Sequence, residues 1–210
     1  MVKRKKKRSK KYKLKKNTRN TIDEALNLHS EGKISEALQS YQNLISKGIK
    51  DYRIFCNYGL ILSNLGKLKE AEISYKKSIK INSNFAPAYS NLGSLQRKIG
   101  KFKEAELSLK KAIEINPDSV NFHYNLGNLL RDIGKLEEAE ISYRKAIKLK
   151  PDLEHPYCNL GIILRKLGKL KEAELYTRKA IEINPNLAET YSNLGIILKE
   201  HRYFNDAETL

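Results

Sequence analysis

The sequence predicts an all-α fold, a solenoid built from stacked pairs of helices. Three observations predict it: landmark residues recur every 34 positions, apolar residues within each block are spaced by three and four, and glycine or Asn-Pro stands where a helix would have to end. A repeat of about 20 to 50 residues is typical of a solenoid, whose neighbouring units bury their apolar faces against each other.

The repeat divides the chain into a tail and six units. Residues 1–17 form a basic tail, and the array covers 18–210 with units at 18–51, 52–85, 86–119, 120–153, 154–187 and an incomplete 188–210. The last unit stops partway into its expected second helix, so Ile196, Ile197 and Leu198 would lack part of their cover. We therefore expect the chain to be a fragment of a longer protein, and the alternative is that its C-terminal end is frayed.

The third unit, 86–119, shows how the two helices of each pair arise. Tyr89, Leu92 and Gln96 share one face of a first helix, because residues three and four apart lie side by side on a helix. The second helix carries an apolar stripe at the same spacing, which comprises Phe102, Ala105, Leu109, Ala112 and Ile113.

Glycine, proline and Asn or Asp mark the helix ends. Gly100, like Gly66, Gly134 and Gly168, is expected to stop a first helix in left-handed geometry. Asn116-Pro117 ends the second helix, because proline cannot continue it. Asp118 is then placed to cap the following helix, and the same slot holds Asn84, Asp152 and Asn186.

Small residues at two further positions predict close contact between the helices of a pair. Glycine recurs on the first helix at 59, 93, 127, 161 and 195, and alanine recurs on the second helix at 37, 71, 105, 139, 173 and 207. A larger side chain at these positions would push the two helices apart.

These landmarks resemble the tetratricopeptide repeat, whose signature is W-x2-L-G-x2-Y, then A-x3-F, then P, in about 34 residues. The third unit has Tyr89, Leu92, Gly93 and Gln96, followed by Ala105, Leu109, Ala112 and Pro117. The resemblance covers residues 18–210. It implies a right-handed superhelix in which the first helices line a concave groove that binds protein segments.

The resemblance places the sixth residue of each unit in that groove, and this residue is asparagine in five units: Asn57, Asn91, Asn125, Asn159 and Asn193. An asparagine amide has an acceptor and two donors, so it can pair with the N–H and C=O of an extended peptide. The alternative is that the asparagines only order neighbouring helices or face water.

Six residues after the asparagine comes a basic column of Arg97, Arg131, Arg165 and Lys199, with Ser63 in the second unit. At about 100° per residue, this column lies about 120° from the asparagines, near the other wall of the same groove. The two columns together suit an extended peptide that carries some acidic residues. The alternative is a solvated charged face.

No catalytic, cofactor-binding or metal-binding constellation is recognisable in these 210 residues. The four histidines are scattered, and the glycines belong to the repeat. The resemblance leaves a second class of function open, because units reading Asn-Leu-Gly are similar to the targeting arm of O-linked N-acetylglucosamine transferases. A glycosyltransferase or sulfotransferase domain would then follow Leu210.

Net charge and cysteines bound the remaining possibilities. Of the formal charge of +17, residues 1–20 contribute twelve Lys or Arg and no acid. Such a tail is expected to be disordered, and it allows three roles: nucleic-acid binding, contact with anionic lipid, or simple solvation. Cys56 and Cys158 lie three units apart and are not expected to form a disulfide. With no signal peptide and no apolar membrane span, we expect a cytoplasmic protein.

Overall fold

The computed structural model describes the backbone of residues 19–208 and the side chains of residues 19–202. Eleven helices and no strand occur in residues 19–208, which confirms the all-α prediction. The chain divides into two compact units, one ending at Leu95 and one beginning at Gln96. The predicted basic tail, 1–17, lies outside the described residues.

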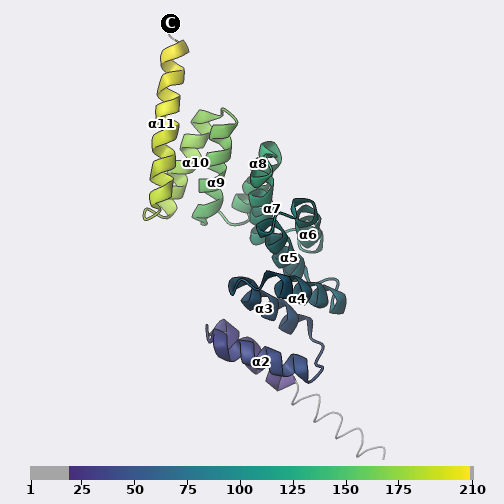
Figure 1. Ribbon diagram of the computed structural model, residues 1–210. Coiled ribbons are helices and arrows are strands. Elements are labelled where there is room, and N and C mark those ends of the chain that lie inside the picture. Colours follow the sequence, from purple (N-terminus) through teal and green to yellow (C-terminus); the bar gives the residue numbers. More distant parts are fainter. Residues whose placement is uncertain (1–18, 209–210) are drawn as a thin grey trace, which may run out of the picture. The chain divides into compact units, whose positions relative to one another are not determined.

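The unit that ends at Leu95 begins with a helix at 19–30, followed by α2 (Ile34–Ser46), α3 (Tyr52–Asn64) and α4 (Leu68–Ile81). The first part of α5 (Ala86–Lys98) completes it. Helices α3 and α4 lie side by side as a pair (Figure 1). Tyr41 and Tyr75, which occupy equivalent positions of the second helices, are fully buried in the two apolar clusters of this unit.

The unit that begins at Gln96 contains five complete helices after the end of α5: α6 (Phe102–Ile115), α7 (Val120–Asp132), α8 (Leu136–Leu149), α9 (Glu154–Lys166) and α10 (Leu170–Ile183), and then α11 (Ala188–Glu208). Helices α7 and α8 pack as one pair and α9 and α10 as the next. One continuous core joins the pairs and includes Leu109, Tyr143 and Leu160.

The predicted turn glycines adopt the left-handed geometry. Gly66 has φ of 76° and Gly134 has φ of 78°, and the N–H of Lys67 bonds the C=O of Leu62 at 2.9 Å. These bonds satisfy carbonyls at the helix end that would otherwise lack partners. The first helices of the five complete units therefore end at their glycines, as the repeat predicts.

The glycines within the first helices allow the predicted close contact. A Cβ on Gly127 would lie 2.7 Å from Cε1 of Tyr143, and one on Gly59 would lie 2.9 Å from Cε1 of Tyr75. Gly161 is similarly close to Thr177. Gly195 is the exception, because nothing lies within 4 Å of the position that its Cβ would take.

The predicted helix caps are wrong at two positions. Asp118 and Asp152 do not cap the helices that follow. The N-cap residue of α7 is Ser119 and that of α9 is Leu153, and neither Ser119 nor Leu153 makes a side-chain cap bond. The turn is held instead by the preceding asparagine: Asn116 Oδ1 accepts the backbone N–H of Asp118 at 3.3 Å. In the equivalent turns, Asn82 Oδ1 accepts the backbone N–H of Asn84, and Asn184 Oδ1 accepts the backbone N–H of Asn186.

The incomplete last unit also differs from the prediction. Helix α11 continues from Ala188 to Glu208 without the expected turn (Figure 1). Arg202 stands where the repeat would place a glycine, and no residue other than glycine has positive φ in the described part of the chain. Ile196 and Leu198 are exposed, as expected for an uncovered helix, whereas Ile197 is buried against the preceding pair.

Candidate functional site

The five asparagines of the repeat lie on the first helices, and all five are half-buried. Most of them reach back to the repeat before. Asn57 Nδ2 lies 3.5 Å from the hydroxyl of Tyr41, and Asn91 Nδ2 lies 3.4 Å from Sγ of Cys56. In the unit that begins at Gln96, Asn193 Nδ2 lies 3.9 Å from Sγ of Cys158. The asparagine column therefore links neighbouring repeats, which is one of the two roles considered for it.

Asn159 on α9 shows this linking role most fully. Its Oδ1 accepts from Arg131 Nη1 at 3.3 Å, and its Nδ2 donates to Asn128 Oδ1 at 3.0 Å and to the hydroxyl of Tyr124 at 3.3 Å. The acceptor and the donor group of this amide are thus engaged within the protein. Both hydrogens of Nδ2 are used, so a peptide carbonyl could bond Asn159 only by displacing Asn128 or Tyr124, whereas Oδ1 keeps a second lone pair.

Asn128 and Tyr143 are parts of this network that the sequence analysis did not identify. The Tyr143 hydroxyl donates to Asn128 Oδ1 at 2.8 Å, and both side chains are buried. Burial raises the pKa of Tyr143 well above its ordinary value, so the hydroxyl keeps its proton and acts as the donor. The sequence sets Asn128 apart, because the equivalent residues of the second, third, fifth and sixth units are Leu60, Ser94, Ile162 and Ile196 and none of them carries an amide.

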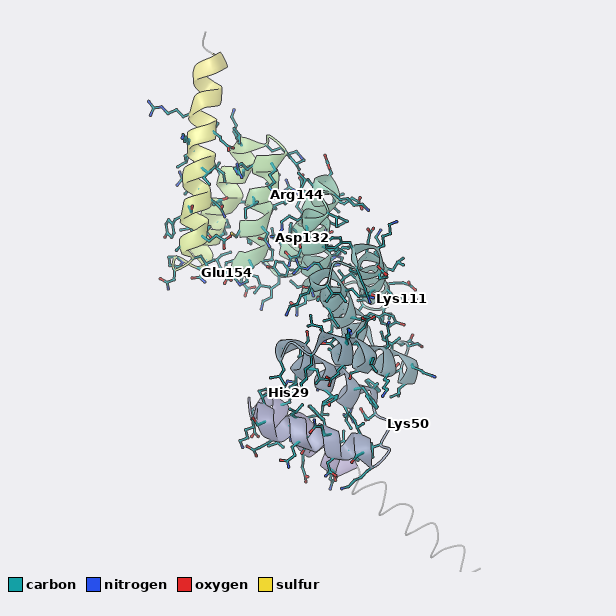
Figure 2. The ribbon with its side chains drawn as sticks, in the orientation of Figure 1. His29, Lys50, Lys111, Asp132, Arg144 and Glu154 are labelled. Carbon is teal, nitrogen blue, oxygen red and sulfur yellow. The ribbon has the colours of Figure 1, made fainter. Side chains whose placement is uncertain are left out.

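The arginines of the basic column are paired with acids. Arg97 Nη1 lies 2.6 Å from Asp132 Oδ2, and Arg165 Nη1 lies 2.6 Å from Glu200 Oε1. Arg131 Nη2 lies 3.0 Å from Oδ1 of Asp132, which therefore serves two arginines. Asp132 is the last residue of α7 and is labelled in Figure 2.

The pairs of Arg97 and Arg165 form because these two arginines reach the next repeat. Asp132 and Glu200 lie 35 residues after Arg97 and Arg165, and the equivalent partner position for Arg131 holds Lys166. Arg131 therefore turns to Asp132 on its own helix and to Asn159. The arginine side chains keep 26 to 31% of their surface exposed, so they remain accessible from solvent.

The contact between Arg131 and Asn159 brings one residue of each column together in the unit that begins at Gln96. Asn125 on α7 and Asn193 on α11 belong to the same column as Asn159, and Lys199 on α11 is exposed. The sequence pattern predicted the two columns about 120° apart, near opposite walls of one groove, and it did not predict the ion pairs. The surface combines amides with guanidinium groups whose charge is partly balanced.

Metal-binding clusters and membrane spans do not occur in the part of the chain that the structure describes. In residues 19–202, no group of three or more His, Cys, Asp or Glu side chains is arranged to hold a metal ion. Cys56 and Cys158 are buried free thiols. Across the described helices, none is both long enough and apolar enough to cross a membrane.

Family models of the tetratricopeptide repeat match most of the array. They cover residues 52–85, 74–106 and 156–187, and a further model described as TPR repeat covers 93–130 and 127–168. The chain therefore belongs to the tetratricopeptide repeat proteins. Proteins of this fold are generally non-catalytic scaffolds that bind proteins or peptides.

Solved structures of similar fold include several tetratricopeptide proteins. The crystal structure of MamA is 25% identical with a TM-score of 0.68, and the match covers 79% of this chain and 96% of MamA. YrrB, described as a TPR protein with an unusual peptide-binding site, is 23% identical with a TM-score of 0.66, over 77% of this chain and 84% of YrrB.

A thermophilic TPR protein of Thermus thermophilus is 20% identical with a TM-score of 0.66, over 86% of this chain and 98% of that protein. Identities at this level establish a shared fold. No curated protein matches the sequence.

Proposed function

We propose that the protein binds an extended peptide segment of a partner protein along the asparagine and arginine face of its first helices. The observation that supports the proposal is the 3.3 Å contact between Arg131 and Asn159, because it brings a residue of each column together. In the unit that begins at Gln96, this face comprises Asn125, Asn159, Asn193, Arg97, Arg131, Arg165 and Lys199. Asn57 and Asn91 form the corresponding column in the other unit.

The residues of this face have different roles in the proposal. Asn159 holds α7 and α9 together, because its amide is already bonded to three side chains. Asn193 has a long contact to a thiol, and a peptide carbonyl can replace that contact at little cost. Asn125 occupies the same column on α7 and, like Asn193, interacts within the protein; we expect the amides of both residues to exchange these contacts for peptide main chain.

The arginines supply the preference for acidic residues. A guanidinium group has five N–H donors, and Arg165 uses Nη1 for Glu200. Its other donors can meet a carboxylate of the peptide, as can the exposed ammonium group of Lys199. At about 1 kcal/mol net per hydrogen bond, four contacts correspond to a Kd near about 1 mM. Tighter binding would need additional side-chain contacts.

The proposal is tested with the full chain on an array of extended peptides that vary in sequence and acidic content. The double variant Asn125→Ala/Asn193→Ala should lose at least about tenfold in affinity, because about 1 kcal/mol is lost at each position. Asn186→Ala is the matched control, since Asn186 lies in a turn and contributes its backbone N–H there. A double variant that binds like the parent would contradict the proposal and leave the asparagines a purely structural role.

A further inference from the structure

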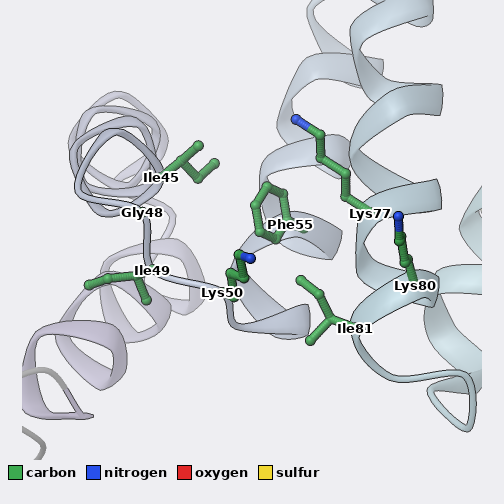
Figure 3. A pocket seen from close by; sticks show the side chains of 8 residues that line it. All are labelled: Ile45, Gly48, Ile49, Lys50, Phe55, Lys77, Lys80 and Ile81. Carbon is green, nitrogen blue, oxygen red and sulfur yellow. The ribbon is translucent and has the colours of Figure 1, made fainter.

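A pocket of about 600 Å³ opens in the unit that ends at Leu95, and none of its lining residues belongs to the asparagine column. Its walls come from α2 and the turn after it, from α3 and from α4 (Figure 3). Four apolar side chains and three lysines line it around Gly48: Ile45, Ile49, Phe55, Ile81, Lys50, Lys77 and Lys80. Pockets of this size and apolar character are typical of binding sites.

The pocket arises where the first repeat departs from the pattern of the others. Helices α4, α6, α8 and α10 have 14 residues and end on Ile or Leu, whereas α2 has 13 and ends at Ser46. Gly48 then turns the chain with φ of 75°, and Ile49 N–H bonds the C=O of Leu44 at 3.1 Å. Lys47 stands at the position of those terminal Ile and Leu residues and is exposed. The junction therefore lacks an apolar side chain that the later repeats have.

The lysines around the pocket have no acidic partner in the described part of the chain. In residues 19–202, no side chain forms an ion pair with Lys50, Lys77 or Lys80, and no carboxylate lines the pocket. Lys76 on the same helix shows the contrast, because its Nζ lies 2.6 Å from Glu72 Oε1. Lys77 Nζ instead lies 5.7 Å from the centre of the Phe55 ring. Figure 3 shows the lysines set around Phe55 and Ile81.

We propose that this pocket docks a segment of a partner protein that inserts a bulky apolar side chain and flanks it with carboxylates. Phe55 and Ile81 offer an apolar floor, and burial of one aromatic side chain there removes about 150 to 250 Å² from water. The lysines at the rim attract the flanking acids and orient the segment. This site lies on different elements from the asparagine face of the unit that begins at Gln96 and does not depend on it.

The probe is a synthetic peptide with one tryptophan between runs of aspartate, titrated into the full chain and followed by fluorescence anisotropy. The parent should bind it, and added salt should weaken the complex, because exposed charges are screened. The double variant Lys77→Glu/Lys80→Glu should bind at least about tenfold more weakly, since reversal turns attraction into repulsion.

The matched control is Lys145→Glu/Lys148→Glu. These lysines occupy the same two repeat positions on α8, and the control changes the net charge by the same amount. It should bind the peptide like the parent. Equal loss in both lysine variants, equal binding of a peptide with alanine in place of tryptophan, or no binding by the parent would overturn the proposal. Binding of decanoate in the pocket without binding of the peptide would also overturn it.

Discussion

Replacing Gly127 with alanine is expected to destabilise the protein, although alanine favours a helix more than glycine does. The added Cβ would lie 2.7 Å from Cε1 of Tyr143, and Tyr143 is fully buried. The ring cannot move outward without disturbing its hydrogen bond to Asn128. The contact between α7 and α8 must therefore open, or the ring must leave its place.

The magnitude follows from three effects of known size. Alanine in place of glycine stabilises a helix by about 1 kcal/mol. Overpacking a core costs about 1 to 3 kcal/mol, and weakening a buried hydrogen bond costs about 1 to 3 kcal/mol. We expect Gly127→Ala to lower the free energy of unfolding by about 2 kcal/mol. Gly195→Ala should raise it by up to about 1 kcal/mol, because nothing lies within 4 Å of that Cβ.

Urea unfolding followed by far-ultraviolet circular dichroism measures both variants against the parent. A second comparison isolates the contact itself. Leucine occupies the position of Tyr143 in the preceding repeat, at Leu109. Gly127→Ala should therefore cost much less in a Tyr143→Leu background, which is a coupling between the two sites. A Gly127→Ala variant as stable as the parent, or an unchanged cost in the Tyr143→Leu background, would refute the reasoning.

Three further predictions concern burial, ionisation and capping. Leu109→Ala should lower the free energy of unfolding, measured in urea, by about 2 to 5 kcal/mol. Leu107 is 71% exposed, so Leu107→Ala should change that free energy by less than about 0.5 kcal/mol. Equal effects would contradict the assigned burial. Burial raises the pKa of the Cys56 thiol from 9.0 to about 11, so its contribution to stability is complete below pH 9 and is lost as pH rises through 11. The free energies of unfolding of the parent and of Cys56→Ala should converge as pH rises from 9 to 11. A difference between them that stays constant over this range would count against the raised pKa of Cys56. Asp51→Ala should lower the free energy of unfolding by about 1 kcal/mol, because Asp51 Oδ1 accepts the Arg53 N–H at 2.8 Å. Ser119→Ala should lower it clearly less, since Ser119 makes no cap bond. A similar melting temperature for the two variants would argue against the cap.

The repeat in the sequence was sufficient to predict the helix pairs, their turns and most close contacts. Gly134 predicted the end of α7 because only its left-handed geometry closes the helix there. Gly127 predicted the close approach of α8 because every other residue type adds a Cβ. These features depend on one residue and its neighbours in the chain. Helix ends and close contacts of this kind therefore recur with the 34-residue period of the sequence.

The candidate site could be predicted only in outline. The asparagine and arginine columns were visible, but their partners depend on which residue of the adjacent repeat lies opposite. Asp132 pairs with Arg97 across 35 residues, and Asn128 meets Asn159 across 31. Neither separation is a multiple of the period. Such contacts require the geometry of two stacked helices, which the sequence pattern does not contain.

Departures from the repeat were the least predictable parts. Arg202 in place of glycine lets α11 continue through the expected turn. Lys47 and Gly48 shorten α2 and open the pocket beside Phe55. In both places the sequence shows that the pattern fails, but only the packing shows what replaces it.

The central claim is that the asparagine and arginine face binds extended peptide. The most direct measurement is a nuclear magnetic resonance titration of the nitrogen-labelled full chain with the best peptide from the array, observing the side-chain amide signals of asparagine. We predict saturable shifts of the Asn125 and Asn193 amide signals, with no shift of the Asn186 signal. Saturable binding that leaves the Asn125 and Asn193 signals unmoved would contradict the claim.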